Sequence, residues 1–295
     1  MVPSPSPRDL LHATLWMGLA LASFTAMAVA GRTIQVELTT FEMMSWRSLI
    51  GFALIAGYVG LRARGDWWAV VRPTSPRLHL TRGVVHFTGQ NLWFYALMLI
   101  PLAQLVALEF TMPVWVALLA PLLLGEAFTR RKTLVAGLGL VGVLIIAQPG
   151  AQALGIGHLA AIGAALFFAL NLIATRAIMR VDRVICVLFW MTGLQTLMSL
   201  PLALIWGGLD WPPAALWPWI GLVAVTGLSA HLALTSALGL APATIIAPME
   251  FLRVPLMALV GMWLYAEPLD LMVLAGGAVI LAANWLNLAP GRVRK

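Results

Sequence analysis

Two stretches of the chain, 141 residues apart, decide its fold. They read ALMLIPLAQLVALEFTMPVWVALLAPLLLGE over residues 96–126 and ALGLAPATIIAPMEFLRVPLMALVGMWLYAE over residues 237–267. Laying one on the other superposes Ala96-Leu97, Pro101, Glu109-Phe110 and Glu126 on Ala237-Leu238, Pro242, Glu250-Phe251 and Glu267. Four of the six glutamates of the chain pair in this way, which indicates an internal duplication.

The duplication extends beyond these stretches. A shift of 144 superposes Phe24, Arg32 and Trp46 on Phe168, Arg176 and Trp190, and a shift of 139 superposes Ala136-Gly137 on Ala275-Gly276. The shift changes between apolar runs, in loops, where insertions are tolerated. We therefore expect a first repeat over residues 1–150 and a second over residues 151–295.

The composition indicates a membrane protein. Of the 295 residues, 61% are hydrophobic and 10% are charged, whereas soluble domains have about 25% charged residues. A bilayer core about 30 Å thick is crossed by roughly 20 apolar residues in a helix. Ten such runs are present: 10–31, 41–61, 78–100, 102–125, 133–148, 156–176, 184–206, 215–239, 244–265 and 269–289. The sequence predicts an all-α membrane protein with ten transmembrane helices.

The basic residues predict the orientation, because arginine and lysine avoid translocated loops. Fifteen of them fall on one side when the loops are taken alternately: Arg8, Arg62, Arg64, Arg72, Arg77, Arg82, Arg130, Arg131, Lys132, Arg176, Arg180, Arg183, Arg292, Arg294 and Lys295. Only Arg32 falls on the other side, so we expect both termini in the cytoplasm and the chain in the cytoplasmic (inner) membrane. Five spans per repeat invert the second repeat relative to the first.

The first run permits a second interpretation. Arg8, the apolar run and the small residues Ala28-Val29-Ala30 also fit a cleavable secretory signal. Its match to the sixth run argues that it is retained.

These features resemble the EamA-type branch of the drug/metabolite transporter superfamily. The resemblance rests on two five-helix halves, the breaks at Pro101 and Pro242, and a glutamate closing the fourth and ninth runs, as Gly125-Glu126 and Ala266-Glu267. Within the family the chain is most similar to YddG-type exporters of aromatic and other neutral amino acids. The resemblance implies efflux without ATP hydrolysis. Alanine stands at 266 where the family pattern has glycine.

Charged residues inside spans are costly and therefore have a function or a partner. Glu109 and Arg47 lie at similar depths below the outer ends of the fourth and second runs, so they are predicted to pair. Arg253 stands three residues after Glu250, within reach on one helix. These four side chains either couple transport to a proton or an ammonium group, or lock helices together as neutral pairs. Glu126 and Glu267, at helix ends, are predicted to be structural anchors.

Polar residues near mid-membrane are the candidates for the substrate path. They are His86, Gln90, Asn91, Asn171 and His231, with Trp16, Trp46, Trp93, Tyr95 and Trp190 as aromatic walls. The alternative is that the amides form interhelical hydrogen bonds and the tryptophans anchor the chain at the interfaces. Prolines mark candidate gates in the fourth and ninth runs: Pro113, Pro121, Pro248 and Pro255.

Other functional classes fit less well. The only cysteine, Cys186, permits neither an internal disulfide nor a thiolate zinc site, and we expect no cofactor and no nucleic-acid partner. The sequence lacks the motifs of an intramembrane enzyme, and its polar residues are too sparse for a channel. We predict an exporter of amino acids and related metabolites. Multidrug or aromatic-cation export, and transport of sugar phosphates or nucleotide sugars, are the alternatives. One chain holds both repeats, so we expect a monomer.

Overall fold

The computed structural model describes residues 6–62, 65–124, 130–147, 155–179, 181–206, 208–241, 249–250 and 252–288, and their secondary structure is helical. The first half contains α1 (Pro7–Ile34), α2 (Thr40–Arg62), α3 (Trp67–Val71), α4 (Pro76–Leu99), α5 (Leu102–Glu109), α6 (Met112–Leu124) and α7 (Arg130–Ala147). The second half contains α8 (Ile156–Ile178), α9 (Val184–Trp206), the short 3₁₀ helix η1 (Ala214–Leu216), α10 (Trp217–Leu240), α12 (Arg253–Tyr265) and α13 (Leu271–Leu288).

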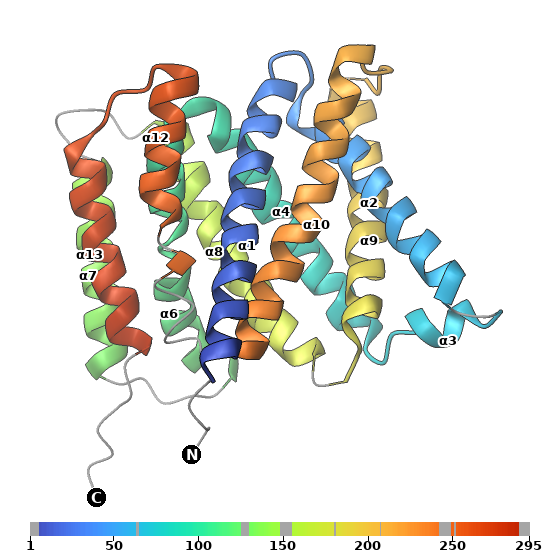
Figure 1. Cartoon of the computed structure of the whole chain (residues 1–295), viewed down its shortest axis with the longest axis horizontal. Coiled ribbons are helices and arrows are strands. Elements are labelled where there is room, and N and C mark those ends of the chain that lie inside the picture. Colours follow the sequence, from blue (N-terminus) through green and yellow to red (C-terminus); the bar gives the residue numbers. More distant parts are fainter. Residues whose placement is uncertain are drawn as a thin grey trace, which may run out of the picture.

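The two halves run in opposite directions. Helix α1 starts at the end of the molecule where α13 ends (Figure 1). Its counterpart α8 runs toward that end. An odd number of spans per repeat has this consequence.

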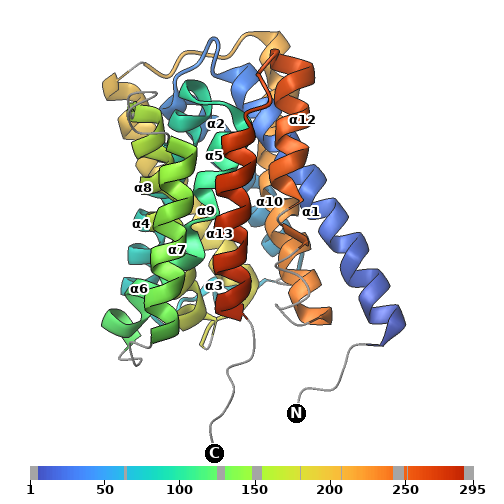
Figure 2. The same ribbon diagram turned by 90° about the vertical axis from the view of Figure 1, so that its left-hand side faces the viewer.

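The helix packing follows the two-fold relation between the repeats. The first transmembrane helix of each half packs on the third transmembrane helix of the other, as α1 on α10 and α8 on α4. Equivalent helices pack on each other, as α2 on α9 and α7 on α13; the second of these pairs stands side by side in Figures 1 and 2. The fold is that of ten transmembrane helices in two inverted five-helix repeats.

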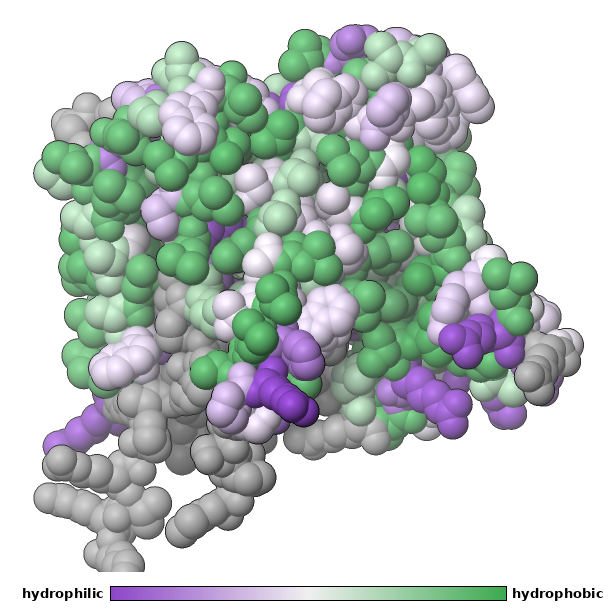
Figure 3. Space-filling view, in the orientation of Figure 1, coloured by the Kyte–Doolittle hydropathy of each residue, from purple (hydrophilic) through white to green (hydrophobic). Residues whose placement is uncertain are grey.

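The surface is suited to a bilayer. Six described segments are long and apolar enough to cross a membrane: Pro7–Ile34, Thr40–Arg62, Leu102–Leu119, Ile156–Thr175, Val184–Trp206 and Ala214–Leu234. The apolar helices Thr133–Ile146, Arg253–Tyr265 and Leu271–Leu286 are shorter. Hydrophobic residues cover most of the middle of the face seen in Figure 3.

The fourth span, an apolar run over 102–125 in which the prolines suggested a broken or bent helix, consists of two helices. Helix α5 ends at Glu109 and α6 begins at Met112. Pro113 favours this restart because proline has no backbone N–H to donate and suits the first turn of a helix. The break frees the Phe110 carbonyl, which accepts a hydrogen bond of 2.9 Å from Asn284 Nδ2 of α13. The carbonyl group at the break therefore has a buried hydrogen-bond partner.

A short helix that the sequence analysis missed, α3, follows the second span. Asp66 caps it by accepting a hydrogen bond of 3.1 Å from the Ala69 N–H. Trp67 and Trp68 are exposed, as interfacial tryptophans are. Five residues are too few to give a helical period in the sequence, which is why the pattern did not predict it.

The end of α12 carries backbone strain that a single substitution tests. Ala266 ends the helix in the left-handed region, with φ of 53°. A side chain there costs about 1 kcal/mol, which glycine avoids. We expect Ala266→Gly to raise the free energy of unfolding by about 1 kcal/mol. The measurement is the midpoint of thermal unfolding of the purified protein in detergent, monitored by tryptophan fluorescence.

Ala53→Gly is the matched control, at an exposed position inside α2. It is expected to lower stability by about 1 kcal/mol. A drop in stability for both variants contradicts the interpretation of Ala266 as strained.

Candidate functional site

A small polar cavity lies between α2 and α4 of the first half and α9 and α10 of the second. Its volume is about 20 Å³, enough for roughly one water molecule. Its polar and glycine lining consists of Arg47, Ser48, Gly51, His86, Gln90, Thr192, Gln195, Gly227 and His231. A small metabolite is larger than this space, so the helices must separate to admit one.

Hydrogen bonds across the cavity join α4 to α9. Gln195 Nε2 donates to Gln90 Oε1 at 2.6 Å and to His86 Nδ1 at 3.0 Å. The rings of His86 and His231 lie 6.0 Å apart between centroids, which brings α10 to the same place. The sequence analysis missed Gln195, although an amide in mid-span is the signal that identified Gln90.

Three of the residues predicted for the substrate path, His86, Gln90 and His231, line this cavity. The other seven do not line it in this structure: Asn91, Asn171, Trp16, Trp46, Trp93, Tyr95 and Trp190. Their place on a substrate path stays a prediction.

Several of these seven have other contacts. Asn91 Nδ2 donates to the Phe87 carbonyl of its own helix at 2.8 Å. Trp190 Nε1 donates to the Val71 carbonyl at 2.7 Å, which holds α3 against α9. Tyr95 is exposed, and Trp16 packs against a cluster of buried residues that includes Met17 of α1 and Ala237 of α10.

The predicted pair of Arg47 and Glu109 is wrong. Glu109 Oε1 instead binds Arg253 NH2 at 2.5 Å, and Glu109 Oε2 accepts a hydrogen bond of 2.8 Å from Trp93 Nε1. The pair was predicted from similar depths in the sequence, but depth alone does not fix which way a side chain points around its helix. The ion pair joins the end of α5 to the start of α12, one broken helix of each repeat.

Arg253 also does not pair with Glu250, as its spacing in the sequence suggested. Arg253 is the first residue of α12, after a turn at Leu252, so the two residues do not share one continuous helix. Its guanidinium lies 4.8 Å from the Phe24 ring centroid and 5.1 Å from that of Phe110. The coupling role predicted for Glu250 stays a prediction.

Arg82 is a further correction, because the sequence analysis placed it among the loop residues. It belongs to α4 and is 7% exposed. Its Nε donates to Thr175 Oγ1 at 2.8 Å, and its NH2 contacts Met191 Sδ at 3.7 Å. A second buried arginine therefore lies close to the cavity.

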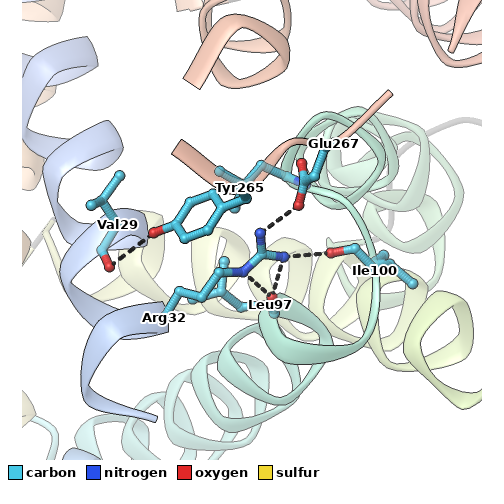
Figure 4. A network of polar contacts seen from close by, with 7 residues as sticks. Val29, Arg32, Leu97, Ile100, Tyr265 and Glu267 are labelled. Carbon is cyan, nitrogen blue, oxygen red and sulfur yellow. Dashed lines mark hydrogen bonds and ion pairs between the residues drawn. The ribbon is translucent and has the colours of Figure 1, made fainter. Parts of the chain in front are cut away.

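Arg32 holds three segments together at the end of the molecule opposite the start of α1 (Figure 4). It donates to the carbonyls of Leu97 and Ile100, which end α4, at 2.7 to 2.9 Å, and forms an ion pair with Glu267. Glu267 also accepts a hydrogen bond of 2.9 Å from the Leu102 N–H. Glu267 is thus a structural anchor between the start of α5 and the loop after α12.

A second polar cluster lies where the α3–α4 loop meets the α8–α9 loop. Asp182 accepts a hydrogen bond of 3.0 Å from the Thr74 N–H and contacts His79 Nε2 at 2.8 Å. Burial raises the pKa of Asp182, but the hydrogen bonds from Thr74 and His79 outweigh it and hold the pKa below its ordinary value.

The same cluster has the residue types of a metal site. Potential ligand atoms of His79, Asp182 and Cys186 lie within 4.8 Å of one another. However, His79 and Asp182 bind each other, and Cys186 Sγ donates to the Val71 carbonyl at 3.3 Å. We interpret the cluster as a clamp between the two loops.

The predicted gate residues are only partly within the described structure. Pro113 and Pro255 lie in the first turns of α6 and α12, next to the breaks. Pro121 belongs to α6, but its side chain lies outside the description, as do Pro248 and Glu126 entirely. The role of the four prolines as gates and that of Glu126 as an anchor stay predictions.

The profile of the EamA-like transporter family matches residues 11–148 and again residues 155–289. The chain belongs to this family. A riboflavin transporter of Rhizobium johnstonii is 29% identical over 94% of this chain and 91% of its own length. The pseudopaline exporter CntI of Pseudomonas aeruginosa is 29% identical over 93% and 95%. An S-adenosylmethionine uptake transporter of Rickettsia bellii is 24% identical over 64% and 63%.

A solved crystal structure shares the fold of this chain. It superposes on 93% of this chain and 96% of its own with a TM-score of 0.62 at 21% identity. Family and relatives agree on the class of activity: this EamA-like protein is a membrane transporter of small molecules, not an enzyme.

The ion pair of Glu109 and Arg253 is open to a double-mutant test. Removing one partner leaves an unpaired charge, which costs about 3 kcal/mol in a buried site. We expect Arg253→Met to lower the free energy of unfolding by about that amount, and Glu109→Gln combined with Arg253→Met to recover most of the loss. Thermal unfolding in detergent measures both.

The matched control is Arg62→Met, at an exposed arginine that ends α2. It is expected to change the midpoint little. Additive losses in the double variant contradict a direct pair.

Proposed function

We propose that this EamA-like transporter exports amino acids, aromatic and other neutral ones, and related small metabolites across the cytoplasmic membrane. The mechanism is alternating access without ATP hydrolysis. We infer that both termini lie in the cytoplasm, because fourteen basic residues, without the buried Arg82, fall on their side of the membrane in the sequence. The Arg32–Glu267 network then closes the outer end.

The observation that carries this proposal is the polar cavity between the repeats. Two helices of each half supply it, and inverted repeats that share a central site can expose it to either side in turn. The amides of Gln90 and Gln195 and the imidazoles of His86 and His231 offer both donors and acceptors. A small zwitterion needs such partners because its polar groups are costly to bury without hydrogen bonds.

The lining also favours this class over the alternatives. Among the described residues, no aspartate or glutamate lines the cavity, so the described lining lacks the counter-charge that an aromatic cation needs. One arginine is in the described lining, fewer than the dianion of a sugar phosphate favours. The relatives are named for riboflavin, S-adenosylmethionine and pseudopaline, so the family fold is used for chemically diverse metabolites.

The test is flux in proteoliposomes. We expect protein-dependent flux of labelled phenylalanine and threonine, and none of a labelled phosphorylated sugar. His86→Ala and Gln90→Ala are each expected to lower the flux about tenfold or more, because each leaves Gln195 short of a buried partner. Repeating the assay with and without a pH gradient shows whether protons drive transport.

Thr88→Val is the matched control in the same helix. The Thr88 hydroxyl bonds the Val84 carbonyl of its own helix, and Thr88 does not line the cavity. Its flux is expected to equal that of the unaltered protein. Flux of the sugar phosphate alone contradicts the amino-acid assignment.

A further inference from the structure

Arg47 is a buried cation without an acidic partner. Its side chain is in the middle of the fold and the residue is 8% exposed. Among the residues that the structure describes, no carboxylate oxygen lies within 4.0 Å of it, whereas Arg32 and Arg253 are each paired with a glutamate. A charge in such a place is costly unless something pairs with it.

The contacts that Arg47 does make leave most of its hydrogen-bonding capacity unused. NH1 donates to Met44 Sδ at 3.4 Å, a weak acceptor, and the guanidinium carbon lies 5.3 Å from the centroid of the Phe94 ring. A guanidinium has five N–H donors in a planar fork. Because Arg47 lines the cavity, its unused N–H donors belong to a residue that a molecule in the cavity can contact.

The backbone of α10 makes room for this guanidinium. A Cβ added to Gly227 would lie 2.9 Å from Arg47 NH2, closer than real Cβ contacts. A side chain at 227 would push the guanidinium away, so glycine permits its present place beside Gln90 and His86 in the cavity lining.

We propose that Arg47 binds the carboxylate of the transported molecule. The fork of the guanidinium fits two carboxylate oxygens with two parallel hydrogen bonds. Gln90, Gln195 and His86 face the rest of the molecule across the cavity. The inference deepens the proposed function and rests on it: the substrates are small organic acids and zwitterions with one carboxylate.

The other buried arginines do not line the cavity. Arg253 is neutralised by Glu109, whereas Arg82 is bonded to the uncharged Thr175 and touches Met191, so its positive charge lies near the cavity. Met191 is also the residue that corresponds to Arg47 in the second repeat, and it lines the cavity as well. Among the described lining residues, Arg47 is the arginine that a molecule in the cavity can contact directly.

The experiment is equilibrium binding to the purified protein by isothermal titration calorimetry, with two acid–amide pairs as probes. They are phenylalanine with phenylalaninamide, and 3-phenylpropionate with 3-phenylpropionamide. We expect both acids to bind and each amide to bind about tenfold or more weakly. Arg47→Met is expected to weaken the binding of both acids about 30-fold or more and to abolish the preference for acids.

Three further variants separate binding from folding. Arg47→Lys keeps the charge without the fork and is expected to restore part of the preference. Gly227→Ala keeps the arginine but displaces its guanidinium, and is expected to weaken acid binding while leaving the thermal midpoint nearly unchanged. Arg62→Met, at the exposed end of the same helix, is expected to bind like the unaltered protein.

The outcomes distinguish this inference from the function on which it rests. Equal binding of acid and amide, normal acid binding by Arg47→Met and Gly227→Ala, or no binding of either acid overturns the inference. If 3-phenylpropionate binds through Arg47 and phenylalanine does not, the amino-acid function fails and the carboxylate site stands. If phenylalanine and its amide are bound and transported alike, the function stands and the site fails.

Discussion

The rest of the structure depends on one constraint: a charge inside an apolar helix bundle needs a partner. Glu109 of the first repeat and Arg253 of the second meet where their helices break, and this contact fixes how the halves cross. Trp93 and the rings of Phe24 and Phe110 surround the pair, and Asn284 takes up the carbonyl that the first break frees. The breaks and their partners form one unit, because removing any member leaves a buried polar group unsatisfied.

The two ends of the molecule are held by different chemistry. At one end a single guanidinium, that of Arg32, serves two carbonyls and the carboxylate of Glu267, which in turn accepts the N–H of Leu102. At the other end the carboxylate of Asp182 joins two loops through Thr74 and His79. Such networks open all at once rather than by degrees, because a partly broken one strands its remaining groups. This behaviour suits a transporter that alternates between discrete states.

The sequence predicted the architecture because identical residues recur at matching positions of the two repeats and because each span is a run of apolar residues. The inversion followed from an odd number of spans. Contacts between helices were not predictable in the same way: the sequence does not fix the directions of Arg47 and Glu109 around their helix axes, and the predicted pair was wrong because Glu109 binds Arg253. Arg82 was misplaced because a basic residue near a span end looks like a loop residue in sequence. His86 and Gln90 were identified by polarity, and Gln195 was open to the same argument.

Two of the buried arginines, Arg47 and Arg253, belong to one half each, and their repeat counterparts are uncharged. Met112 stands where Arg253 stands in the other half, and Met191 stands where Arg47 does. Glutamate, by contrast, is kept at both 109 and 250. An ancestral dimer of two identical first halves would bury two glutamates with no Arg253 to neutralise either, so the present halves have diverged past the point where either one replaces the other. At this contact the two halves are therefore complementary and no longer interchangeable.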